Sequence, residues 1–253
     1  MKERFGAVPY LYGTAMSSAL ALLLAIPLGL GTAVYLVELA PRRLGSIVAF
    51  VVELLASIPS IVYGLWGLFV LAPTLRSVFE PWLIKHLGFL PLFQGFPFGI
   101  GMLNAGIVLA VMVVPTIVSI SREILLSMPR ALREAALALG ATRAEAIAVT
   151  LDAARPGILG AVILALGRAL GETMAVTMVI GNTNRVSLSL LAPSATMASV
   201  IANEFTEATS KLHLSALIEI ALVLLAVTML VNAVARVLVI WSTGGRRDVA
   251  GAA

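Results

Sequence analysis

The sequence predicts an all-α membrane protein, a polytopic bundle of about five transmembrane helices. Hydrophobic residues make up 60% of the 253 residues and charged residues 12%, whereas a soluble domain carries about 25% charged residues. The apolar residues also gather in continuous runs of about 20 or more, the length that a helix needs to cross a bilayer. Helices are expected because lipid offers the backbone no hydrogen-bond partners.

Five apolar segments account for the predicted spans, and together they form one transmembrane domain over residues 1–253. The segments are 10–39, 44–71, 100–120, 157–180 and 213–241. The first two exceed the ~20 residues that a span requires, so tilt or kinks are expected. Pro27, Pro59 and Pro115 lie inside spans, and simple kinking is the favoured role for each.

The basic residues predict the orientation of the bundle. They gather in the turn after the first span, in the segment 121–156 and in the C-terminal tail: Arg42, Arg43, Arg122, Arg130, Arg133, Arg143, Arg155, Arg246 and Arg247. The positive-inside rule makes these regions cytoplasmic, which puts the C-terminus inside and the loops 73–99 and 182–212 outside. An outside N-terminus with Lys2 and Arg4 is unusual, and a further span upstream of this chain would account for it.

Several function classes are excluded by what the sequence lacks. The chain has no cysteine and two histidines, so a disulfide framework and a cysteine or histidine-rich metal site are not expected. It has no G-x-x-x-x-G-K-[ST] string, the loop with which many ATPases bind phosphates. The net charge of +4 is small and dispersed, which does not suggest nucleic acid. We therefore expect no catalytic residues and no metal.

The segment 127–158 predicts two cytoplasmic helices joined by a bend. The first has an apolar face at helical spacing, made of Leu132, Ala135, Ala136 and Leu139. Gly140 is expected to end it, and Thr142 with Glu145 forms a capping-box pattern that starts the second. The first helix either rests on the membrane surface or docks into a partner. Docking is favoured because the segment has no Trp or Phe.

The string EAALALG (134–140) resembles the EAA signature of the permeases of binding-protein-dependent ABC importers. That resemblance implies a type I permease core of five helices, although the family usually has six spans. It also implies that the first cytoplasmic helix is a coupling helix that docks into an ATPase subunit. The residues assigned to this coupling are Arg133, Glu134, Ala135, Ala136, Gly140 and Ala141.

Further strings resemble the phosphate-permease branch of that family. They are FGAVPYLYGT (5–14), AIPLGLGTAVYLVELAP (25–41), SIPSIVYGLWG (57–67), GRALGETMAV (167–176) and IANEFTEA (201–208). The resemblance implies a subunit of a phosphate importer in a bacterial inner membrane. Its implied partners are a PstA-like second permease, two PstB-like ATPase subunits and a PstS-like phosphate-binding protein outside. This chain would carry no cofactor, because ATP and Mg²⁺ would be bound by the ATPase partner.

Two charges inside the predicted fourth span are the candidate substrate contacts. Arg168 and Glu172 are four residues apart, so on a continuous helix they share a face and can pair. Charged residues inside a membrane are costly and are functional candidates by default. A guanidinium matches the oxygens of phosphate, Glu172 would compete for it, and Thr173 offers a hydroxyl. From the residues alone, a purely structural salt bridge between Arg168 and Glu172 is as well supported as a substrate contact. The resemblance favours a role in phosphate passage.

Three alternatives remain open from the sequence. The same architecture could carry another oxyanion, such as molybdate or sulfate. An ion-coupled secondary transporter is a different class, but the internal repeats typical of such transporters are not found. A non-transporting scaffold is a third class, and it leaves the cost of placing Arg168 and Glu172 in the membrane unexplained.

Overall fold

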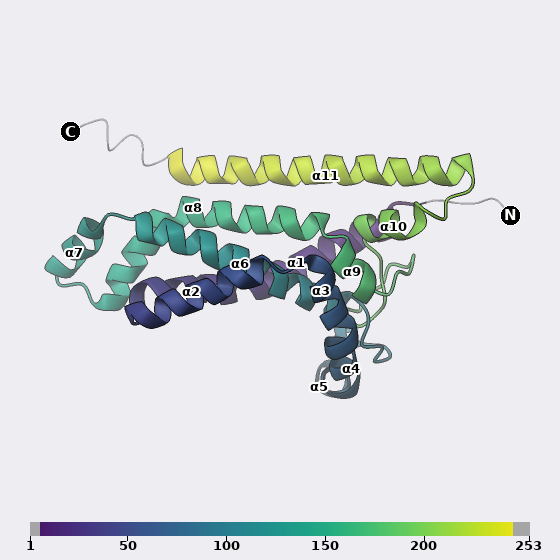
Figure 1. Cartoon of the computed structure of the whole chain (residues 1–253), viewed down its shortest axis with the longest axis horizontal. Helices are drawn as coiled ribbons and strands as arrows, with labels where there is room; N and C mark the ends of the chain where they lie inside the picture. The colour runs from purple at the N-terminus through teal and green to yellow at the C-terminus, as the bar shows by residue number, and fades with distance from the viewer. Residues whose placement is uncertain (1–5, 245–253) are drawn as a thin grey trace. The chain divides into compact units, whose positions relative to one another are not determined.

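The computed structural model describes residues 6–244, and the regular elements in this range are helices (Figure 1). In chain order they are α1 (Val8–Val34), η1 (Tyr35–Leu39), α2 (Arg42–Ala56), α3 (Ser60–Trp66), η2 (Gly67–Leu71), α4 (Ala72–Thr74), η3 (Leu75–Phe79), α5 (Glu80–Leu87), η4 (Pro91–Phe93), α6 (Met102–Ser127), α7 (Arg130–Ala138), α8 (Arg143–Gly171), α9 (Met174–Val179), α10 (Met197–Glu204) and α11 (Lys211–Gly244). η1, η2 and η3 are π-helical and continue their neighbouring α-helices without a break.

In the described range 6–244, five helical segments are long and apolar enough to cross a membrane, the number that the sequence predicts. They are Val8–Leu39, Ser60–Leu87, Met102–Ser127, Arg143–Gly171 and Lys211–Ile240. Many of their large apolar side chains are exposed, for example Leu23, Phe69, Leu164 and Leu230. Side chains of this kind would face lipid or other subunits in a membrane protein, because lipid tails are as apolar as they are.

The second predicted span, 44–71, is wrong. α2 ends at Ala56, a new helix begins at Ser60, and the membrane-length segment runs on to Leu87. Pro59 causes the break, because it has no N–H and its ring disfavours helix in the residue before it. Ser57 Oγ closes the last turn of α2 by donating to the Leu54 carbonyl at 2.7 Å. Residues 73–87 are therefore helical, whereas the sequence predicted a loop.

The chain divides into two compact units. Unit 1 comprises Met1–Leu24, Ile58–Val113 and Gly167–Met229, and unit 2 comprises Ala25–Ser57, Val114–Leu166 and Leu230–Ala253. One core of unit 1 brings together α1, α10 and α11 through buried side chains: Tyr10, Ala195, Met197, Val200, Leu217 and Ile220. Thr14 Oγ1 accepts a hydrogen bond from the Met197 N–H at 2.9 Å, which fixes the start of α10 against α1.

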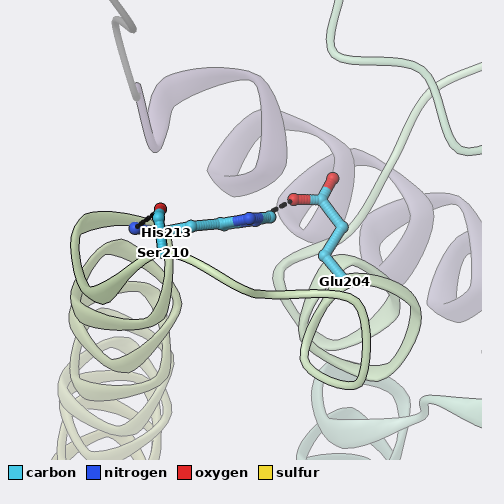
Figure 2. A network of polar contacts seen from close by, with 3 residues as sticks. All are labelled: Glu204, Ser210 and His213. Atoms are coloured by element: carbon cyan, nitrogen blue, oxygen red, sulfur yellow. Dashed lines mark hydrogen bonds and ion pairs between the residues drawn. The ribbon is translucent and has the colours of Figure 1, made fainter.

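A hydrogen-bonded pair of side chains joins α10 to α11 in unit 1. Figure 2 shows the imidazole of His213, at the start of α11, pointing to the carboxylate of Glu204 at the end of α10, with Nε2 3.0 Å from Oε2. Ser210 Oγ accepts a hydrogen bond from the His213 backbone N–H at 3.1 Å and so caps α11. The segment between the two helices is thereby held at both of its ends.

Unit 1 also contains a buried polar cluster that the sequence did not predict. Glu80 in α5 is 1% exposed, and its Oε2 accepts a hydrogen bond from the Gly99 N–H at 2.9 Å. Asn104 in α6 is equally buried and donates to the carbonyls of Gly99 and Gly67. Buried polar groups are stable when their hydrogen bonds are made, so these bonds hold the loop before α6 against α5 and η2.

Unit 2 packs α1, α2, α6 and α8 around two small apolar clusters. One contains Ala33, Leu125, Ala154 and Ile158, and the other contains Leu36, Val52 and Val118. Figure 1 shows α7 as a short helix off the ends of α6 and α8. Small residues at these contacts let membrane helices approach closely.

Candidate coupling helix and substrate pathway

The helix α7 is the predicted coupling helix, and its residues have the predicted secondary structure. It contains Arg133, Glu134, Ala135 and Ala136, while Gly140 and Ala141 form the turn that follows. The sequence favours helix here because alanine, leucine, arginine and glutamate are strong helix formers. Pro129 precedes it as the N-cap, where the lack of an N–H costs little.

A Schellman motif ends α7 at Gly140, which confirms the predicted bend. The Ala141 N–H donates to the Ala136 carbonyl at 3.1 Å, and the Gly140 N–H donates to the Leu137 carbonyl at 3.0 Å. This closure needs a left-handed residue at the position after the cap. Gly140 has φ of +87°, a conformation that is costly for residues with a Cβ.

The predicted capping box at the start of α8 is also confirmed. The Glu145 carboxylate accepts from the Thr142 N–H at 2.7 Å and from the Thr142 hydroxyl at 2.8 Å. Thr142 Oγ1 accepts in turn from the Glu145 N–H at 3.4 Å. These reciprocal bonds satisfy free N–H groups of α8. Only two residues, Gly140 and Ala141, therefore separate the two capped ends.

Within residues 6–244, no element buries the apolar face of α7. None of the α7 residues is buried, and Leu139, at its C-cap, is 90% exposed. A shallow groove of about 620 Å³ lies beside the helix, lined by Leu132, Ala148, Val149, Asp152 and Ala153. An exposed apolar face on a helix is typical of an interaction surface.

α7 is joined to the end of the first helical segment by an ion pair. The Arg133 guanidinium contacts the Glu38 carboxylate in η1. The sequence predicted a coupling role for Arg133 and gave no signal for Glu38, which stands at the end of a long apolar run.

The candidate pathway residues Arg168, Glu172 and Thr173 lie around a helix break in unit 1. α8 ends at Gly171, and α9 begins at Met174, so Arg168 is in the last turn of α8 while Glu172 and Thr173 lie between the helices. The prediction that Arg168 and Glu172 share one face of a continuous helix is therefore wrong. All three residues are half-buried.

Hydrogen bonds within the break explain why the chain leaves the helix there. Glu172 Oε1 accepts from the Ala175 N–H at 3.2 Å, which caps the start of α9. The Thr173 hydroxyl donates to the Gly171 carbonyl at 3.2 Å. Broken helices in transporters place backbone and side-chain polar groups at the substrate site. The arrangement thus concentrates polar groups where the sequence predicted substrate contact.

The short helix α9 is held in place by close packing on α3. A Cβ added at Gly64 would lie 2.8 Å from Met178 Sδ and 2.9 Å from Ala175 Cα. α3 contains part of the string SIPSIVYGLWG, which carries the family resemblance. Gly64 in this string therefore also has a packing role. The two helices fix the C-terminal side of the break.

Comparison with known proteins decides the family. Residues 25–241 match the family described as "Binding-protein-dependent transport system inner membrane component". The chain belongs to this family. It is thus a multi-pass inner-membrane permease component of an ABC transport system, and a non-catalytic one.

The relatives and the solved structures agree with this family membership. The chain is 48% identical to the phosphate transport system permease protein PstC of Mesorhizobium japonicum over 239 residues, which are 92% of this chain and 73% of the relative. It is also 48% identical to the PstC of Xylella fastidiosa strain 9a5c, over 95% of this chain and 75% of the relative. A chain of the inward-facing MetNI methionine ABC transporter matches with a TM-score of 0.68 and 20% identity over 93% of this chain and 95% of that one. That structure confirms the fold of this permease family.

Proposed function

We propose that this chain is the permease subunit of an ATP-driven importer of inorganic phosphate and forms half of its translocation pathway. The supporting observation is the 48% sequence identity, over 92% and 95% of this chain, to two relatives named for phosphate transport. The helix α7, with its exposed apolar face, fits the role of a permease that is driven by a separate ATPase. In this proposal ATP and Mg²⁺ bind to the ATPase and this chain holds no cofactor.

The partners follow from the division of labour in such a system. Two PstB-like ATPases would receive the coupling helices, a PstA-like permease would supply the other half of the pathway, and a PstS-like protein would deliver phosphate from outside. α7 would lie on the cytoplasmic side with the C-terminus, since the arginines of 121–156 favour that side. Closure of the ATPases would displace α7 and switch the pathway between its two openings.

Arg168, Glu172 and Thr173 are the proposed phosphate contacts of this subunit. The guanidinium would donate to the phosphate oxygens, and the Thr173 hydroxyl could exchange its backbone acceptor for phosphate. Glu172 caps α9 and would add negative charge close to the anion. A site that combines attraction with repulsion binds weakly enough for phosphate to leave, which passage through a membrane requires.

Uptake by the complete transporter in sealed vesicles tests the cargo. We expect ATP-dependent accumulation of labelled phosphate that excess unlabelled phosphate suppresses and excess molybdate does not. Uptake of molybdate that phosphate fails to suppress would replace the proposed cargo by another oxyanion. Vanadate-insensitive uptake driven by a proton gradient alone would replace the ABC mechanism by secondary transport.

Substitution of Gly140 by valine tests the coupling helix. A β-branched residue cannot readily adopt φ of +87°. Keeping the turn after α7 would cost about 1–2 kcal/mol, so this turn is expected to open and α7 to lose its orientation. We expect less ATPase subunit to co-purify with the variant and ATP-driven uptake to fall. The matched control is Gly160→Ala in α8, where an added Cβ meets nothing within 4 Å. Equal co-purification and uptake for both variants would contradict the assignment of α7.

A further inference from the structure

The contact between Arg133 and Glu38 crosses from α7 to η1 within unit 2. The Glu38 side chain is 6% exposed and that of Arg133 is 39% exposed. One partner is therefore part of the packed end of the first helical segment, while the other is on the surface helix proposed to meet the ATPase. The pair joins an element built into the bundle to an element that is largely outside it.

The Glu38 carboxylate depends on Arg133 for its compensation. Glu38 Oε2 is buried and accepts no hydrogen bond from the described residues. Its polar contact is the ion pair with Arg133. Removing one member of a buried ion pair leaves an uncompensated charge, which is strongly unfavourable. A displacement of α7 that separated the two groups would carry this cost, so the two elements are expected to move together.

The charged residues around the pair favour the contact between Arg133 and Glu38. A cavity of about 450 Å³ lies beside it, and its charged lining residues are Glu38 with Arg122, Arg130 and Arg133. Glu38 is the acidic residue of this lining, so no second carboxylate there competes for Arg133. Arg122 and Arg130 add positive charge to the same lining.

The backbone at Glu38 is suited to transmit a movement. η1 is π-helical over Tyr35–Leu39 and continues α1 directly. π-Helical turns are rare and occur frequently at functional sites, where they interrupt the regular α-helical bonding. A displacement of Glu38 would therefore act on an irregular helical turn at the end of a membrane-length helix.

We propose that Arg133 and Glu38 are a positioning pair that transmits the displacement of α7 to the first membrane helix during the ATPase cycle. The proposal rests on the proposed function and deepens it, because it names the contact that couples ATP hydrolysis to the pathway in this subunit. Neither residue touches phosphate in this assignment. Their effect is on how much transport each ATP produces.

The test measures ATP hydrolysed and phosphate accumulated in the same vesicles with the complete transporter. Arg133→Gln and Glu38→Gln are each expected to lower the phosphate moved per ATP by about fivefold or more. The double variant is expected to match the single variants, since residues that act as a pair are not additive. Arg133→Lys retains the charge and is expected to restore most of the ratio.

Glu53→Gln is the matched control, because Glu53 is an exposed carboxylate on α2 in the same unit. It is expected to leave the ratio unchanged. Ratios for the single variants equal to that of the unmodified chain, or losses that simply add in the double variant, would overturn the proposal. Arg133 is partly exposed, so its variants keep the test available if Glu38→Gln does not fold. A wrong cargo would show differently, as no phosphate uptake by the unmodified chain.

Discussion

Arg168→Ala is expected to lower ATP-driven phosphate uptake by about 10- to 100-fold, because a hydrogen bond to a charged group contributes about 1.5–3 kcal/mol. Arg168 is in the last turn of α8, half-buried and immediately before the break at Glu172 and Thr173. A guanidinium there presents several donors in a plane to an anion. Alanine removes all of them and leaves the pathway without this source of positive charge.

Two further variants separate anion contact from structural support. Arg143→Ala, at the exposed start of the same helix, is the matched control and is expected to transport normally. Arg168→Lys retains a charge without the planar fork, so intermediate uptake is expected. Uptake is measured at several phosphate concentrations, with the amount of assembled transporter determined in each sample. Normal uptake by Arg168→Ala at normal assembly would assign the residue a structural role instead.

The coupling region was the part of the site most predictable from the sequence. Its signals are local: Gly140 provides the left-handed turn, and Thr142 with Glu145 satisfies free N–H groups within four residues. Such motifs depend little on the rest of the fold. The five membrane-length segments were likewise predictable in number, because apolar length is a property of the chain itself.

The helix breaks were not predictable because hydropathy does not record them. Residues 44–71 form one apolar run, yet Pro59 separates α2 from α3. Proline is tolerated within many membrane helices, so its presence alone did not indicate a break. The interruption at Glu172 and Thr173 depends on the capping bond to Ala175, which a hydrophobic pattern does not contain.

The Arg133–Glu38 pair was missed for a different reason. The two residues lie 95 positions apart in sequence. Arg133, directly before the EAA-like string, was assigned to coupling through the resemblance, and Glu38 was not singled out. Packing within unit 2 brings them together. A contact of this kind is a property of the tertiary structure, and one sequence without relatives gives no signal for it.

Gly13→Ala is expected to destabilise unit 1 by about 1–3 kcal/mol, the usual cost of forcing an added group into a packed site. A Cβ at Gly13 would lie 2.1 Å from the carbonyl oxygen of Ala195 and 2.9 Å from its carbonyl carbon. These are backbone atoms of the segment that leads into α10, so they cannot rotate away as a flexible side chain can. The clash would also strain the nearby bond between Thr14 and Met197.

Gly31→Ala supplies the matched control within the same helix. An added Cβ at Gly31 meets nothing within 4 Å, and alanine is favoured over glycine in a helix by about 0.5–1 kcal/mol. Thermal unfolding in detergent, followed by circular dichroism, is therefore expected to show a lower midpoint for Gly13→Ala and an equal or higher midpoint for Gly31→Ala. Equal midpoints for the two variants would mean that α1 does not approach Ala195 as closely as the structure has it. The same substitution is thus expected to lower the stability at Gly13 and to maintain or raise it at Gly31. Since alanine changes the helix propensity alike at both positions, the difference between the two variants reports the packing of unit 1.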